Sequence, residues 1–184
     1  MPAASDPIVV VPYDASWPEE FRGYAERIRA VLGPAAVRID HVGSTSVPGL
    51  AAKPIIDIQV SVASLEPVAP YAGPLAKLGY TYEPTNDDRT KRAFRWPPGQ
   101  RRTHLYARAA GSFEEQLNLL FRDYLRTHPL DAREYAKVKG ELAETFRHDR
   151  EGYVRAKEPT VWSLLQRAHT WSQGTGWAPG PSDA

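Results

Sequence analysis

Residues 41–60 read HVGSTSVPGLAAKPIIDIQV, and the fold can be built from this stretch. The β-branched run at 37–42, which overlaps the start of this stretch, predicts a strand that leads into a glycine- and serine-rich loop. The run PIIDIQVSV at 54–62 predicts a second strand. Side chains alternate across a strand, so its two faces differ. The apolar face carries Ile56, Ile58, Val60 and Val62, and the polar face carries Asp57, Gln59 and Ser61. We expect the first face in the core and the second open to chemistry.

The loop itself has the composition of an anion site. Gly43 allows a ligand to approach the backbone closely, and the hydroxyl side chains that follow it can donate to a phosphate; these are Ser44, Thr45 and Ser46. Lys53 adds a positive charge, and Asp57 can hold a hard divalent cation. We therefore predict a phosphate site between Gly43 and Asp57. The alternative is structural: the glycines shape a long hairpin, the hydroxyls cap turns, and Asp57 is an exposed strand residue.

On either side of this stretch the pattern predicts strands followed by helices. Ser16 and the acids after Pro18 favour a helix that ends near Leu32. The expected elements after 62 are a helix at 67–78, strands at 80–83, 92–96 and 103–108, and helices from 113, at 131–146 and at 159–171. This order favours an α+β fold in which helices pack on one side of a mixed or antiparallel sheet, with a C-terminal helical part. We expect one domain over 1–172 and a flexible tail over 173–184.

The composition excludes several classes of protein. Of 184 residues, 42% are hydrophobic and 24% charged, as in ordinary globular domains, and no apolar run approaches the roughly 20 residues that span a membrane. The chain has no cysteine, which rules out disulfides and thiolate ligands and favours a cytoplasmic location. A net charge of +1 makes a nucleic-acid partner unlikely by charge alone. The expected partner is a nucleotide or another phosphorylated small molecule, with no membrane involved.

Positive charge gathers in one segment. Residues 89–108 contain seven Lys or Arg residues and no acid. Arg95 and Arg102 are therefore candidates for binding nucleotide phosphates, and Lys157 is a further candidate from the helical part. The alternative is that these charges keep an exposed sheet edge from pairing with other chains. His104, on the polar side of its strand, is a candidate metal ligand or proton acceptor.

Five segments of the chain together resemble the GrpB family, a branch of the nucleotidyltransferase superfamily. They are VPYDASWPEEF at 11–21, the stretch at 41–60, THLY at 103–106, FRDYLRTHPLDAREYAKVKGELA at 121–143 and GYVRAKEP at 152–159. The resemblance implies that Gly43, Ser44 and Asp57 form the first part of the superfamily's nucleotide site. Gln59 stands where the second acid of that site is expected. The family resemblance further implies a Mg²⁺ or Mn²⁺ ion weakly held by Asp57, Gln59 and His104. It also implies that Asp57, His104 and Lys53 are the catalytic residues.

Three functions remain open at this level. The first is transfer of a nucleotidyl group from a nucleoside triphosphate to a small acceptor. The second is a nucleotide- or CoA-type binding module that has lost catalysis, which Gln59 and Tyr106 favour because both depart from the superfamily pattern. The third is an accessory partner of a metabolic enzyme, since GrpB-like domains also occur joined to some dephospho-CoA kinases.

Overall fold

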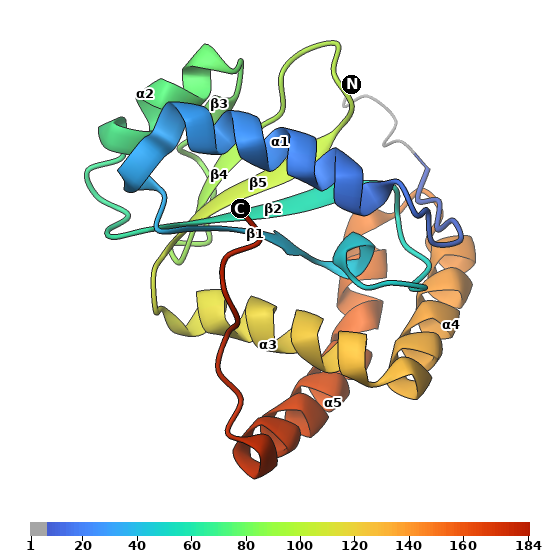
Figure 1. Cartoon of the computed structure of the whole chain (residues 1–184). Helices are drawn as coiled ribbons and strands as arrows, with labels where there is room; N and C mark the ends of the chain where they lie inside the picture. The colour runs from blue at the N-terminus through green and yellow to red at the C-terminus, as the bar shows by residue number, and fades with distance from the viewer. Residues whose placement is uncertain (1–6) are drawn as a thin grey trace.

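The computed structural model describes residues 7–184, so the first six residues of the expected domain lie outside it. Five strands form one sheet in the order β1-β2-β5-β4-β3 (Figure 1). Their bounds are β1 Arg38–Val42, β2 Ile56–Val62, β3 Thr81–Glu83, β4 Arg92–Arg95 and β5 Thr103–Ala109. β2 runs parallel to β5, and all other neighbouring pairs are antiparallel. The sheet is therefore mixed, as the sequence predicts.

The apolar face of the sheet is covered by α1 (Trp17–Leu32) and α2 (Ala69–Lys77) (Figure 1). The apolar face expected for 54–62 does lie in this core: the alternate residues of β2 are buried against both helices and β5. Fully buried members of this core include Trp17, Ile28, Ile56, Ile58, Leu75 and Leu105. The apolar side chains that alternate along β2 therefore pack against the apolar stripe of α1 in one core layer.

The polar face of β2 is covered by α3 (Phe113–Thr127). Glu115 on α3 is fully buried and accepts hydrogen bonds from the Ser61 hydroxyl and, at 2.8 Å, from the Gly111 backbone N–H. Gln59 donates to the Glu115 carbonyl oxygen and accepts from the Asn118 amide at 2.8 Å. The expected architecture is therefore confirmed: α1 and α2 lie on one side of the sheet, and the C-terminal helical part reaches the other face through α3, to which the polar side chains of β2 bond.

The C-terminal helical part consists of α3, α4 (Pro129–Thr145) and α5 (Arg150–Thr175). It has a second core, to which Val47 and Leu50 contribute from the segment between β1 and β2. α5 begins earlier than the expected 159, because Asp149 caps it by accepting from the Gly152 backbone N–H at 2.8 Å. Pro159 lies inside this helix instead of starting it.

Residues 173–184 do not form the flexible tail that we expected. α5 continues to Thr175, and the last residues lie along the edge strand β1 (Figure 1). Ala184 donates its backbone N–H to the Ile39 carbonyl oxygen at 3.2 Å. The Asp183 carboxylate accepts from the His41 backbone N–H and from Arg122, both at 2.9 Å. The tail is ordered because it supplies hydrogen-bond partners to an otherwise open edge of the sheet.

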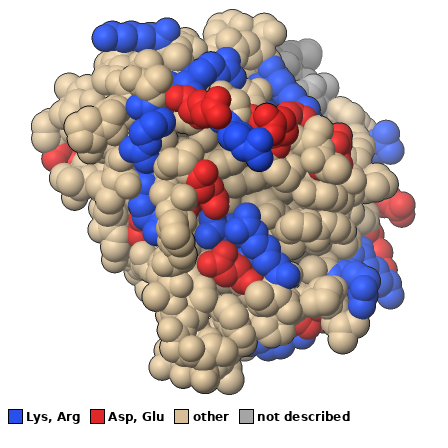
Figure 2. Space-filling view, viewed as in Figure 1, with Lys and Arg blue, Asp and Glu red and all other residues tan. Residues whose placement is uncertain are grey.

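On the face shown in Figure 2, acidic and basic side chains are interspersed, without a broad surface of one sign. This mixture of charges agrees with the net charge of +1, and the face shown offers no broad surface of one sign for a large charged partner. None of the helices within residues 7–184 combines the length and the apolar composition that crossing a membrane requires.

Candidate functional site

The loop after β1 and the start of β2 are packed tightly together. Gly43 has a positive φ of 71°, and the 3₁₀ turn Ser44–Ser46 follows it. A Cβ atom at Gly43 would overlap the Asp57 carboxylate and lie 2.9 Å from its Cγ. Both the backbone angle and the close approach therefore require glycine. The residue pattern that predicted an anion loop corresponds to a turn closed directly against Asp57.

Asp57 and His104 face each other across the two parallel strands. The register pairs Asp57 with His104, and His104 Nδ1 lies 2.8 Å from Asp57 Oδ1. An ionised carboxylate only accepts hydrogen bonds, so Nδ1 carries the hydrogen, and in the neutral ring Nε2 is then an acceptor. Nε2 is buried and has no hydrogen-bond partner among residues 7–184. The pair thus presents one ring nitrogen that is available to a ligand.

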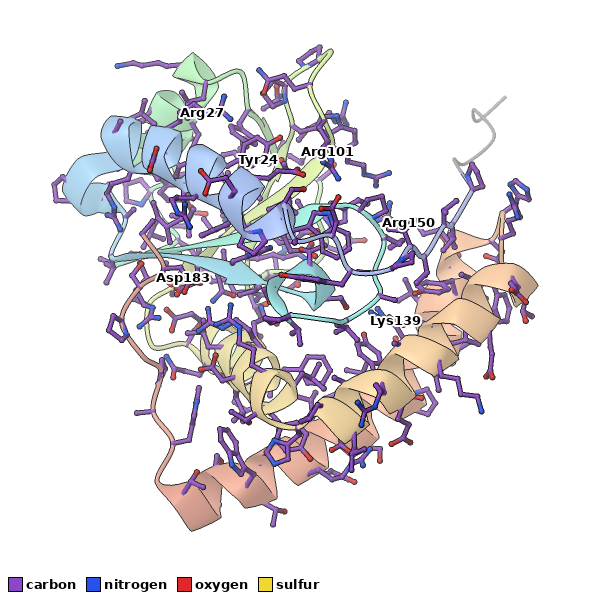
Figure 3. The ribbon with its side chains drawn as sticks, turned by 45° about the vertical axis from the view of Figure 1, so that its right-hand side comes forward. Tyr24, Arg27, Arg101, Lys139, Arg150 and Asp183 are labelled. Carbon is purple, nitrogen blue, oxygen red and sulfur yellow. The ribbon has the colours of Figure 1, made fainter. Side chains whose placement is uncertain are left out.

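A cavity of about 260 Å³ lies where the loop, the sheet and the helices meet. The loop contributes Gly43, Ser44 and Thr45, and the strands contribute Asp57 and His104. The helices contribute basic side chains: Lys139 from α4, and Arg150 and Lys157 from α5. In Figure 3, Lys139 and Arg150 both lie beside the segment that joins β1 to β2. The cavity is therefore built by two halves of the molecule: the sheet half, with its loop, and the helical half, with α4 and α5.

The charge in this cavity is strongly one-sided. Four basic side chains line it without an ion pair to any carboxylate within residues 7–184: Lys53, Lys139, Arg150 and Lys157. Arg122 also lines it, but its guanidinium bonds to Asp123 and Asp183 at 2.8 and 2.9 Å. Asp57 is the acidic lining residue. The excess of positive charge favours a ligand with several negative charges.

Burial makes these lysines costly to keep charged. Burial, with a smaller contribution from Lys157, lowers the pKa of Lys139 to about 7. It also lowers the pKa of Lys53 to about 8, with Arg150 and Lys157 adding to the effect. Asp57 opposes the shift in both cases. A bound anion would supply the missing opposite charge and restore the protonated form of both lysines.

Aromatic rings hold the lysine side chains in place. The Lys139 ammonium lies 4.6 Å from the centre of the Tyr135 ring and donates to the Ala51 carbonyl oxygen at 2.6 Å. Lys53 and Lys157 lie 5.4 and 5.6 Å from the centre of the Tyr153 ring. Cation–π contacts of this kind orient an ammonium without neutralising it. The charges are therefore positioned but remain available to an anion.

The structure brings most of the residues singled out in the sequence to this cavity. Those that line it are Gly43, Ser44, Thr45, Lys53, Asp57, His104 and Lys157. Ser46 does not, because its hydroxyl donates to the Gly43 carbonyl oxygen. Gln59 does not either: its amide is bonded to α3, so the expectation that it is a metal ligand is corrected. Arg95 pairs with Glu83 at 2.8 Å, and Arg102 lies over Trp96, both away from the cavity.

Sequence reasoning missed three important lining residues: Lys139, Arg150 and Tyr153. A signal for Lys139 was present, because it falls four residues after Tyr135 on the inward face of α4, where a charged residue is unexpected. Tyr153 falls in the family-like segment at 152–159 but was not selected as a site residue, and no comparable signal marked Arg150, since the predicted helix began after both.

The family resemblance implies a divalent metal, and the side chains around the cavity limit how such an ion could be held. Paired divalent ions are usually neutralised by several carboxylates. Within residues 7–184 no group of three or more His, Asp or Glu side chains is placed to hold a metal ion. A protein-held metal pair therefore does not fit. A single Mg²⁺ or Mn²⁺ fits only at Asp57, with ligand phosphate oxygens completing its shell, as is common for Mg²⁺. His104 does not fit as a second ligand of that ion, because Nδ1 faces Asp57 and Nε2 points to the opposite side of the ring.

Comparison with known proteins places this chain in a family. The family model described as GrpB protein matches residues 7–167. A crystal structure of conserved protein GrpB from Enterococcus faecalis is 31% identical, with a TM-score of 0.80, and the match covers 89% of this chain and 99% of that one. The chain belongs to the GrpB family. An RNA terminal U-transferase structure matches with a TM-score of only 0.47 and 18% identity, too slight a likeness to carry an argument.

Curated relatives differ in length. A UPF0157 protein of Pseudomonas aeruginosa is 43% identical over 170 residues, which cover 90% of this chain and 69% of that protein. A UPF0157 protein of Bacillus subtilis is 35% identical, and the match covers 50% of it. Proteins named dephospho-CoA kinase, such as that of Mycobacterium tuberculosis, are 34% identical over 202 residues, which cover 96% of this chain and 49% of theirs. The chain thus spans about half the length of several relatives.

Proposed function

We propose that this chain binds a phosphorylated small molecule of the nucleotide or CoA class in the cavity beside Gly43. The observation that carries the proposal is the set of four basic side chains around that loop that have no carboxylate partner in the described part of the chain: Lys53, Lys139, Arg150 and Lys157. Backbone and hydroxyl donors at Gly43 and Ser44 complete a phosphate-binding arrangement. Relatives named dephospho-CoA kinase support the inclusion of CoA precursors among the candidate ligands.

A ligand screen by thermal stabilisation tests this proposal. Nucleoside triphosphates, CoA, dephospho-CoA and tripolyphosphate would each be added with and without Mg²⁺. A ligand at 100 times its dissociation constant stabilises a protein by about 2.7 kcal/mol, which is a shift of several degrees for a domain of this size. We expect such a shift for at least one polyphosphate. If none of them shifts the melting temperature at millimolar concentration, the proposal is wrong.

The Asp57–His104 pair favours a second candidate function, nucleotidyl transfer. In that reaction an acceptor hydroxyl would lose its proton to His104 Nε2, and its oxygen would attack the α phosphorus of a nucleoside triphosphate. The bond from that phosphorus to the bridging oxygen would break, and pyrophosphate would leave. Lys53 and Arg150 would neutralise the phosphates. A single divalent ion held by Asp57 and the ligand phosphates, when bound, would add to this neutralisation.

Release of pyrophosphate distinguishes transfer from binding alone. The chain would be incubated with each triphosphate, Mg²⁺ or Mn²⁺, and an extract of small metabolites as the source of acceptors. Transfer predicts release that the His104→Gln variant reduces by about 100-fold or more. Tight nucleotide binding without release in any combination would leave the binding function standing and reject the catalytic one.

A further inference from the structure

A second hollow adjoins the phosphate cavity and is not explained by it. This groove has a volume of about 540 Å³ and lies beside β4 and β5. It is lined by Trp96, Arg102 and Tyr106, and it shares His104 and Arg150 with the cavity described above. The two hollows therefore meet at those shared side chains, on the face of the sheet that carries Asp57.

The cavity beside Gly43 is small for a whole nucleotide. Sites for whole small molecules usually measure roughly 300–1,000 Å³. The cavity beside Gly43, at about 260 Å³, falls below that range, although its charge suits a chain of phosphates. A ligand that also carries a sugar and a base must therefore extend beyond it, and the groove provides the adjoining space.

The chemistry of the groove suits a planar ring. The Arg102 guanidinium lies 4.8 Å from the centre of the Trp96 ring, so that a flat cation and an aromatic ring occur together. The Tyr106 ring lies 6.0 Å from the ring of His104, centre to centre, and continues the aromatic surface towards the phosphate cavity. Aromatic and guanidinium planes are the groups on which nucleic-acid bases stack, whatever the base.

Charge in the groove is consistent with the same ligand. Its acidic lining residue, Glu83, is neutralised by Arg95 at 2.8 Å. Arg150, at the junction, has no ion pair within residues 7–184 and lines both hollows. A phosphate at the junction would therefore meet a guanidinium as it passes from one hollow to the other.

We propose that the groove lined by Trp96, Arg102 and Tyr106 holds the base of a nucleotide whose phosphates occupy the cavity beside Gly43. This inference rests on the proposed phosphate binding and adds the substrate class: a nucleoside polyphosphate, bound across both hollows. It assigns the basic segment at 89–108 a role in binding the base, where the sequence suggested binding of phosphates.

Calorimetric titration with tripolyphosphate and with the four ribonucleoside triphosphates tests the inference. Tripolyphosphate has the phosphates without a base, so it probes the first cavity alone. We expect the tightest nucleotide to bind at least 10-fold more tightly than tripolyphosphate. Trp96→Leu and Arg102→Gln should each weaken nucleotide binding by about 10-fold, in line with base stacking, and leave tripolyphosphate binding unchanged.

The controls separate the possible outcomes. Trp162→Leu removes an exposed tryptophan of α5 that lines neither hollow, and it should change nothing. Trp96 also packs against the core, so its variant is read together with Arg102→Gln and with the melting temperature of each. Equal affinity for tripolyphosphate and nucleotide, or equal losses for both in the groove variants, would overturn the inference while phosphate binding stands. Absence of all binding would reject the proposed function, and the inference with it.

Discussion

Among single residues, Asp57 is the one whose surroundings are most tightly specified. The Gly43 backbone closes against its carboxylate, and His104 Nδ1 lies 2.8 Å from Oδ1. Among the cavity-lining residues in the described part of the chain, Asp57 is the acidic one, and four basic side chains without an ion pair there lie around it. Its position is therefore determined by sterics and hydrogen bonding at least as much as by charge.

Gly43→Ala should disrupt the site through its contact with Asp57. The new Cβ would overlap the carboxylate, and the backbone conformation of Gly43, with φ 71° and ψ −173°, adds about 1–3 kcal/mol of strain for any other residue. We expect a drop of at least 10-fold in polyphosphate affinity, measured by calorimetry. Gly49→Ala is the matched control, because Gly49 has a φ of 78° but nothing within 4 Å of an added Cβ. Equal losses in both variants would show that backbone strain alone is responsible.

Affinity for polyphosphate should fall as pH rises from about 7 to about 9. The ligand prefers protonated lysines, and in the free protein Lys139 and Lys53 lose their protons with pKa values of about 7 and about 8. Each step up in pH therefore adds the cost of protonating them. Lys139→Met should flatten the dependence, whereas Lys137→Met, at an exposed lysine of the same helix, should not. An affinity that is constant over this range would contradict these assignments.

At the level of helices and strands, the sequence predicted which face of a strand each residue occupies better than it predicted which helix packs on that face. Alternation in 54–62 placed Asp57 and Ile58 on their correct faces, because the period of a strand is fixed by its backbone. That Gln59 bonds to α3 could not be predicted, since it depends on how a helix far along the chain docks. Arg150 and Tyr153 were missed for a local reason: the Asp149 cap starts α5 upstream of Pro159.

Gln59→Asp tests the correction made at that position. By sequence pattern this change restores the second acid of a nucleotidyltransferase site. In the structure the side chain lies under α3, where the shorter carboxylate would lose both amide hydrogen bonds. We expect a loss of about 1–3 kcal/mol in the free energy of unfolding in urea and no gain in Mg²⁺-dependent stabilisation. Stronger Mg²⁺ binding in the variant would place Gln59 at the metal site after all.

Asp183→Ala tests whether the C-terminal segment is part of the fold. The change removes the acceptor for the His41 backbone N–H and an ion-pair partner of buried Arg122. We expect the free energy of unfolding to fall by about 1–3 kcal/mol. Asp183→Asn keeps an acceptor oxygen and should lose less. No change in either variant would mean that the segment contributes nothing to stability.

In the molecule as a whole, the proposed site depends on both halves being in place. The sheet half supplies the loop, Asp57 and His104, and the helical half supplies Lys139, Arg150 and Lys157. A polyphosphate bound there would join the two halves and stabilise both by mass action. This arrangement explains how a nearly neutral chain can present a strongly basic pocket: many of its acids lie elsewhere, in ion pairs such as Arg101–Glu20 and Arg167–Asp131.

Calorimetric titration of tripolyphosphate into the wild-type chain and the double variant Lys139→Met, Lys157→Met addresses the phosphate site itself. Both lysines line the cavity, and methionine retains most of their volume while removing the charge. Losing two charge-assisted contacts, each worth about 1.5 kcal/mol or more, should weaken binding by at least 100-fold. Wild-type affinity in a double variant that is still folded would show that the anion binds somewhere else.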